Sequence, residues 1–96
     1  MFIAVNRINA PKEAVDHMIE AFHRNSASLK DVPGFIAFEL WRGEDTLEAV
    51  SKWESRVAFE FWRNSDNFLA SHAGARSSQG GGSTTAYYEG EIVVER

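Results

Sequence analysis

The order in which two kinds of hydrophobic spacing follow one another along the chain is the feature that most constrains its fold. Two segments repeat apolar residues at helical spacing, and β-forming segments flank each of them. Strands are predicted at residues 2–8, 35–41, 47–53 and about 86–95, and helices at about 11–29 and from residue 56 onward. The resulting order, β-α-β-β-α-β, is typical of a ferredoxin-like α+β fold, in which two helices cover one face of an antiparallel four-stranded sheet.

The strand predicted at 35–41 carries apolar residues on both of its faces. One alternate set contains Ile36, Phe38 and Leu40, and the other contains Phe35, Ala37 and Trp41. The strand at 2–8 is apolar on both sides as well. Because a sheet with helices on one face is normally polar on the other, we predict that a second copy of the chain covers the outer face, giving a dimeric α+β barrel. The simpler alternative is that some strand positions are merely exposed aromatics.

Length and composition narrow the possible functions. The 96 residues suit a single domain, 1–96, with a mobile polar loop at about 74–85, where Gly and Ser are frequent. The chain has no cysteine, which excludes disulfides and thiolate chemistry, and a reducing cytoplasm is the expected compartment. A net charge of −4 with mixed signs and no apolar run near the ~18 residues of a membrane span predict neither nucleic acid nor a membrane as partner.

One of the three histidines has an unusual setting. His72 follows Phe68 and Leu69 on one stripe of a predicted short helix, which directs its imidazole toward an apolar surface. It is therefore either a hydrogen-bonded core histidine or a ligand. His17 and His23 lie six residues apart, on different faces of the first predicted helix, and we expect both to be solvated.

Trp62, Phe59 and Asn6 are further candidates for a site. Trp62 and Phe59 lie one helical turn apart, a spacing that is also typical of core packing. On an unbroken helix Trp62 and His72 would lie ~15 Å apart along the axis, too far to share a small site. The polar run at 64–67 predicts a break that would let them approach. Asn6, within an apolar strand, is either hydrogen-bonded, exposed or a functional donor.

Several stretches carry a family resemblance: Asn-Arg-Ile at 6–8, Pro-Gly-Phe at 33–35, Trp-Glu-Ser at 53–55 and above all residues 58–72. Together they resemble the bacterial non-canonical haem oxygenases, the IsdG-type and mycobacterial haem-degrading enzymes of the antibiotic biosynthesis monooxygenase superfamily. The resemblance spans nearly the whole chain. It implies a monooxygenase that binds haem as cofactor and substrate, opens the porphyrin at a meso carbon with O2 and releases iron. A separate reductase or other external reductant would supply the electrons.

The resemblance also implies residue roles. His72 would be the proximal iron ligand, Trp62 would press on the porphyrin, and Asn6 would hydrogen-bond on the distal side. Three more residues match positions that line the pocket or meet a propionate: Phe22, Phe59 and Arg24. Two alternatives stay open, because a fold does not determine a function. One is a cofactor-free monooxygenase of a quinol or other aromatic, which gives no reason for His72. The other is a non-enzymatic haem-binding dimer.

Overall fold

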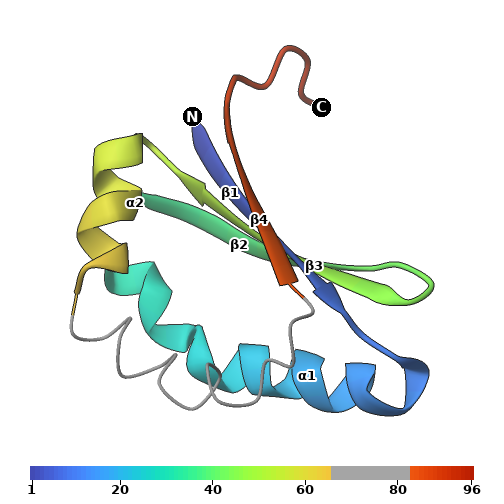
Figure 1. The fold of residues 1–96 in the computed structure, drawn as a ribbon. Helices are drawn as coiled ribbons and strands as arrows, with labels where there is room; N and C mark the ends of the chain where they lie inside the picture. The colour runs from blue at the N-terminus through green and yellow to red at the C-terminus, as the bar shows by residue number, and fades with distance from the viewer. Residues whose placement is uncertain (66–82) are drawn as a thin grey trace.

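The computed structural model describes residues 1–65 and 83–96. Its elements are β1 (Phe2–Asn9), α1 (Lys12–Asn25), the 3-10 helix η1 (Ala27–Asp31), β2 (Phe35–Arg42), β3 (Thr46–Trp53), α2 (Arg56–Arg63) and β4 (Ser83–Glu89). The strands form one antiparallel sheet in the order β2-β3-β1-β4 (Figure 1). The predicted ferredoxin-like α+β fold is therefore confirmed. Among the described residues, no helix is long and apolar enough to cross a membrane.

Alternate residues of β1 and β3 face the two helices. Phe2 lies opposite Trp53 in the register of these strands, and Asn6 lies opposite Ala49. Along β3 every second side chain is buried, which is the expected pattern for a strand with one covered face. We call this helix-covered side of the sheet the inner face.

The apolar residues on the inner face form two separate clusters. The first joins Phe2 and Trp53 to Phe59 of α2, and the second joins Leu47 to Val15 of α1. Ala49 is buried, with 6 % of its surface exposed, but it belongs to neither cluster. The middle of the inner face, at Ala49 and its partner Asn6, therefore carries small side chains between two larger apolar groups.

A β-bulge near the start of β2 changes which of its residues face the helices. The register places Phe35 opposite Trp53 and Ala37 opposite Lys52, so Phe35 and Ile36 together oppose one residue of β3. Phe35 consequently packs edge-on against Trp53, with ring centroids 5.4 Å apart, whereas Ile36 is 45 % exposed. The predicted grouping of Phe35 with Trp41 is wrong, because simple alternation does not anticipate a bulge.

Two predicted boundaries also differ from the structure. The first helix ends at Asn25 rather than near residue 29. The hydroxyl of Ser26 donates to the carbonyl of Phe22 at 2.5 Å, and the chain continues as η1. A serine that bonds the backbone in this way satisfies a carbonyl at the helix end, which favours termination.

The last strand is β4, which begins at Ser83 and ends at Glu89 rather than spanning 86–95. Residues 83–85 thus belong to a strand and not to the predicted loop, because they pair with β1. After Glu89 the chain runs beyond the sheet (Figure 1). Ile92, Val93 and Val94 stay at least half exposed there, despite their β-branched side chains. The rest of the predicted loop, residues 74–82, lies outside the described residues.

The outer face of the sheet, opposite the helices, carries apolar side chains. Val5 and Val50 lie directly opposite each other and are half-buried. Two aromatic residues on this side are more exposed, Trp41 at 59 % and Tyr88 at 57 %. The face is therefore apolar at its centre and at its sides.

Two of the charged groups on the outer face, Glu39 and Lys52, form an ion pair, while Arg7 and Glu48 lie opposite each other on the same face. Lys52 Nζ lies 3.0 Å from Glu39 Oε2, and the indole Nε1 of Trp41 donates to Glu39 Oε1 at 3.0 Å. The hydrogen bonds from Lys52 and Trp41 hold the pKa of Glu39 below its ordinary value. Because the charges of Glu39 and Lys52 neutralise each other, their desolvation by an apolar partner on this face costs less free energy.

Candidate functional site

Helix α2 carries Phe59 and Trp62 toward the inner face. The helix begins after Ser55, whose hydroxyl accepts the amide hydrogen of Ala58 at 3.2 Å, an N-terminal cap. Phe59 and Trp62 follow one turn apart, and their ring centroids are 6.1 Å apart. The helix ends at Arg63, where the polar run of the sequence begins, as predicted. The expected continuation with Phe68, Leu69 and His72 lies outside the described residues.

Trp53 forms the wall behind these two aromatics. Its side chain is fully buried, and its ring centroid lies 5.3 Å from that of Trp62, with the planes inclined by 31°. Phe59 meets Trp53 edge-on at 5.8 Å. The indole Nε1 of Trp53 is buried and has no hydrogen-bond partner among the residues that the structure describes. Ring packing, and not a hydrogen bond to a described residue, therefore orients the side chain of Trp53.

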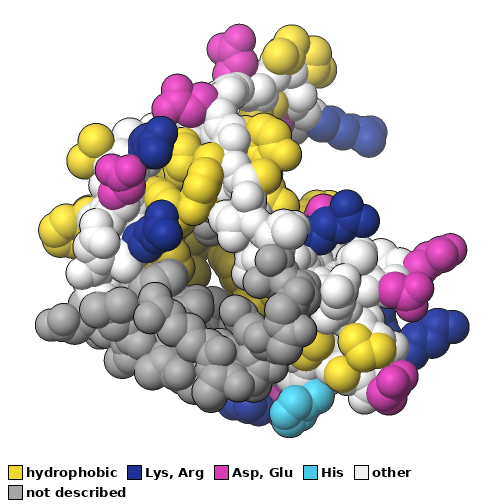
Figure 2. Space-filling view, viewed as in Figure 1, with side chains coloured by type: hydrophobic (Ala, Val, Ile, Leu, Met, Phe, Trp, Pro, Cys, Tyr) yellow, Lys and Arg dark blue, Asp and Glu magenta, His cyan; other side chains and the backbone are white. Residues whose placement is uncertain are grey.

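Tyr87 ties β4 to the same aromatic group. Its ring stacks on Phe2 at 5.9 Å and contacts Phe59 at 5.7 Å, and its hydroxyl accepts a hydrogen bond from Arg63 at 3.3 Å. Figure 2 shows hydrophobic side chains gathered between α2 and β4. Strand β4 and helix α2 thus hold the aromatic group from two sides.

Asn6 occupies the small-residue middle of the inner face. Its Oδ1 atom is buried and accepts no hydrogen bond within the described part of the chain. An unpaired buried acceptor of this kind costs about 1–3 kcal/mol. Among the described residues, the Oδ1 atom is thus neither hydrogen-bonded nor exposed. Because this oxygen has no partner among the described residues, Asn6 is a polar group on the inner face that a bound molecule could satisfy.

Ser51 is a polar residue of the inner face that the sequence interpretation missed. It is 7 % exposed and lies opposite Ala4, which places it diagonally across the β1–β3 ladder from Asn6. Diagonal neighbours on one face of an antiparallel pair lie about 7–8 Å apart. The signal was present in the sequence, because Ser51 shares the inward set of β3 with Leu47 and Trp53.

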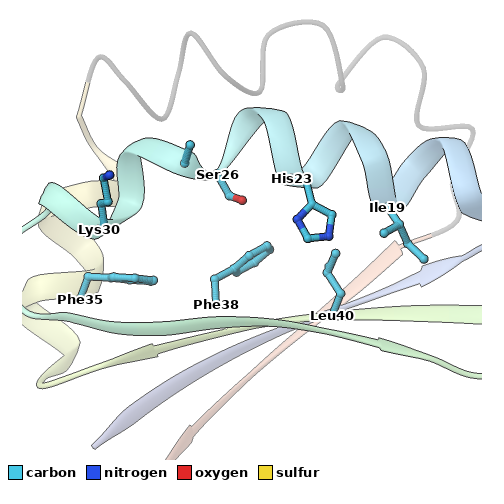
Figure 3. Close-up of a pocket in the computed structure, with 8 residues that line it drawn as sticks. Ile19, His23, Ser26, Lys30, Phe35, Phe38 and Leu40 are labelled. Atoms are coloured by element: carbon cyan, nitrogen blue, oxygen red, sulfur yellow. The ribbon is translucent and has the colours of Figure 1, made fainter.

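Phe22 lies on α1 and contacts β2. Its ring centroid is 5.9 Å from that of Phe38. Beside this contact a cavity of about 490 Å³ opens between α1, η1 and β2. Figure 3 shows Phe35, Phe38 and Leu40 rising from β2 into this cavity, while His23 points from α1 toward them. The cavity is lined by Ile19, His23, Ser26, Ala27, Lys30, Phe35, Phe38 and Leu40.

Arg24 lies on the surface of α1. Its guanidinium is 3.1 Å from Glu20 Oε1, one helical turn away, and both side chains are more than half exposed. His17 and His23 are exposed residues of the same helix. Within residues 1–65 and 83–96, no group of three His, Cys, Asp or Glu residues could hold a metal ion.

The structure thus brings some of the predicted site residues together and separates others. Phe59 and Trp62 meet over Trp53. Asn6 shares their side of the sheet, since it alternates with Phe2, whereas Phe22 packs against β2. Arg24 forms its surface ion pair, and His72 is outside the described residues.

Comparisons with known proteins give the site a context. Residues 1–74 match the family model described as antibiotic biosynthesis monooxygenase. No curated protein matches the chain. A solved structure of an MhuD variant, with two manganese protoporphyrin IX molecules bound per active site, is 28 % identical, covers 100 % of this chain and 98 % of its own, and has a TM-score of 0.76. A variant of SnoaB, a cofactor-independent oxygenase from Streptomyces nogalater, is 21 % identical, with 98 % and 97 % covered and a TM-score of 0.80.

Proposed function

Because the chain belongs to the antibiotic biosynthesis monooxygenase family, we propose that it is an oxygenase, and specifically one that binds haem and degrades it. The observation that carries the specific part is the buried Oδ1 of Asn6, which has no hydrogen-bond partner within residues 1–65 and 83–96 and lies on the same side of the sheet as Trp62. The porphyrin-bound MhuD structure, 28 % identical over the whole chain, supports the same assignment. The SnoaB likeness supports only the fold, since its identity is 21 %.

The chemical character of the inner face fits a porphyrin. A macrocycle needs an extended apolar surface, and Trp62, Phe59 and Phe22 offer aromatic rings there. It also needs few polar contacts near its centre, and Asn6 supplies a carboxamide that can offer an acceptor or, after a half-turn, a donor. We assign Trp62 to contact with the ring, Asn6 to hydrogen bonding near its centre and Phe22 and Phe59 to the walls.

Two assignments rest on the resemblance of the sequence. His72 would coordinate the iron, because a neutral imidazole is a common haem ligand. Arg24 would meet a propionate, which requires it to leave the ion pair with Glu20. Such an exchange is inexpensive, because exposed helical ion pairs contribute only about 0.3–0.5 kcal/mol.

Haem, when bound, would supply both the iron that reacts with O2 and the ring that is opened. The protein's own part is to hold the ring against Trp62, to keep water away with aromatic walls and to place one amide near the reacting centre. The chain has no cysteine that could carry electrons, so we assign that task to an external reductant or a separate reductase.

We also propose that two chains pair through the outer face of the sheet. Val5 and Val50 at its centre are apolar, and Trp41 and Tyr88 remain exposed on the single chain. The charges of Glu39 and Lys52 neutralise each other, so a second copy of the face would meet no unpaired charge from this pair. The pairing would give the dimeric α+β barrel expected from the sequence.

A titration with hemin tests the assignment. Purified protein should develop a shifted Soret band that saturates near one haem per chain, and this band should disappear when a reductant is added in air. A stable band under reductant and air would mean that the chain carries haem without degrading it. No binding at all would contradict the proposal and favour the cofactor-free oxygenase instead.

A further inference from the structure

Trp53 is buried directly behind Trp62, and nothing in the sequence comparison assigns it a role. We propose that Trp53 is the positioning residue of the site: it fixes the tilt of the Trp62 indole and thereby sets how far a bound porphyrin is bent out of plane. This inference rests on the proposed function, because it concerns the same bound ring. Out-of-plane distortion of the macrocycle is one of the means by which a protein controls haem reactivity.

The backbone of Trp53 is held on both sides by the sheet. Trp53 pairs with Phe2 of β1 and with Phe35 of β2. The amide of the next residue, Glu54, donates to the carbonyl of Gly34 at 2.8 Å. With none of its side chain exposed, Trp53 is a fixed reference point at the end of β3.

Trp62 is held at the end of α2 rather than within the sheet, and its carbonyl accepts the amide hydrogen of Ser65 at 2.9 Å. It is the second-last residue of α2, a helix of eight residues, and the hydroxyl of Ser65 donates to its carbonyl at 2.6 Å. Residues near helix ends have fewer intrahelical hydrogen bonds, so side-chain packing decides the orientation of the indole. Trp53 lies closer to Trp62 than Phe59 does, with centroid distances of 5.3 and 6.1 Å.

The side chain of Trp53 is itself fixed by rings on two edges. Phe35 meets it at 5.4 Å with planes inclined by 74°, and Phe59 meets it at 5.8 Å with planes inclined by 68°. Edge-to-face contacts of this kind are favourable arrangements for aromatic pairs. Because Nε1 has no partner among the described residues, replacement of Trp53 by Phe removes no protein hydrogen bond there. The change therefore tests ring packing.

The first measurement uses the protein without haem. Two indoles this close couple electronically, and the pair gives an exciton couplet in the circular dichroism spectrum. We expect Trp53→Phe and Trp62→Phe each to abolish this couplet. Trp41→Phe is the matched control, because Trp41 is exposed on the opposite face of the sheet, and it should retain the couplet. A couplet that persists in Trp53→Phe would overturn the proposed contact.

The second measurement uses the protein loaded with hemin. In Trp53→Phe we expect hemin affinity to stay within about threefold, while the resonance Raman bands of out-of-plane distortion weaken and turnover falls about tenfold. A merely structural role would lower stability but leave the Raman bands of the bound fraction unchanged. Unchanged bands with full turnover would overturn the inference.

Phe35→Leu provides a second variant should Trp53→Phe fail to fold. It leaves both indoles in place but removes the edge contact that holds Trp53. We expect a reduced couplet and intermediate Raman bands, and wild-type values in both would contradict the positioning role. If the wild-type chain does not bind hemin, the proposed function fails, whereas the couplet of Phe35→Leu, which keeps both indoles, still tests whether the packing of Trp53 sets the relative orientation of the two rings.

Discussion

Gly34 lies so close to Ala58 that a Cβ atom on Gly34 would come within 2.5 Å of the Ala58 Cβ. Gly34 also has a φ of +82°, a conformation that residues with a Cβ adopt rarely. The turn before β2 and the first turn of α2 therefore meet at a position that only glycine fits. This contact sets how closely α2, with Phe59 and Trp62, approaches the sheet.

Replacement of Gly34 by Ala should destabilise the fold by about 2–4 kcal/mol, because backbone strain and overpacking add together. Urea denaturation followed by circular dichroism would measure the change in the free energy of unfolding. Gly90→Ala is the control, since a Cβ there meets nothing within 4 Å. Equal stability of the two variants would show that α2 is not held in this way.

Replacement of Asn6 by Leu should lower activity without lowering stability. The unpaired Oδ1 is removed and apolar volume is added, so we expect the free energy of unfolding without ligand to stay the same or rise. Hemin turnover should fall, because the amide near the ring is lost. Asn9→Leu is the control on the exposed end of β1. A clear loss of stability in Asn6→Leu would mean that the amide is already satisfied in the folded protein.

The pairing of Glu39 with Lys52 predicts a pH-dependent contribution to stability. The pKa of Glu39 is lowered in the folded state, so the pair stabilises the protein fully above the unfolded value of 4.5 and loses this effect as pH falls through the folded pKa. The stability difference between wild type and Glu39→Gln should therefore be largest near neutral pH and shrink in acid. Glu44→Gln, at an exposed position between β2 and β3, is the control substitution.

A charge at the centre of the outer face should separate the two chains of the proposed dimer. Val5→Glu would place a carboxylate opposite Val50, where an apolar partner would have to desolvate it. Sedimentation should show a dimer for the wild type and a monomer for this variant. Val57→Glu is the control, because Val57 is 74 % exposed on α2. A wild-type monomer, or an unchanged dimer in Val5→Glu, would contradict the proposed interface.

The assignment of His72 as the iron ligand predicts a change in the spectrum of bound haem. His72→Ala should abolish the ligand-field bands of the hemin complex, while His17→Ala, on the exposed face of α1, should leave them unchanged. Absorption and electron paramagnetic resonance spectra would make the comparison. Identical spectra for His72→Ala and wild type would require another ligand.

Hydrophobic spacing was sufficient to predict the order of the elements along the chain. It failed where a local hydrogen bond or a pairing partner decided the outcome. The Ser26 hydroxyl bonds to Phe22 and the first helix ends early. Ile92 and Val93 are β-branched residues, which favour strands. The pairing of β4 with β1 nevertheless ends at the Phe2–Glu89 pair, before these residues are reached. Neither effect can be derived from periodicity.

One contact of the candidate site could be predicted from the sequence, but the arrangement of its residues could not. Trp62 and Phe59 stood out because they share one helical stripe, and they do pack together. Trp53 and Ser51 were missed as site residues, because their place beside Trp62 and Asn6 follows from sheet register. Arg24 is a different case. The family resemblance implies a contact with a propionate, whereas in the structure Arg24 forms an ion pair with Glu20, its neighbour one helical turn away.

The division of the inner face into two apolar clusters affects how readily this protein can change during evolution. The first cluster joins the sheet to α2 and η1, the second joins it to α1, and neither includes Ala49 or Ser51. Most core mutations are limited by the stability they cost. Here the residues that shape the interior are partly separate from those that maintain the fold, and descendants of this scaffold can acquire new substrates while remaining folded.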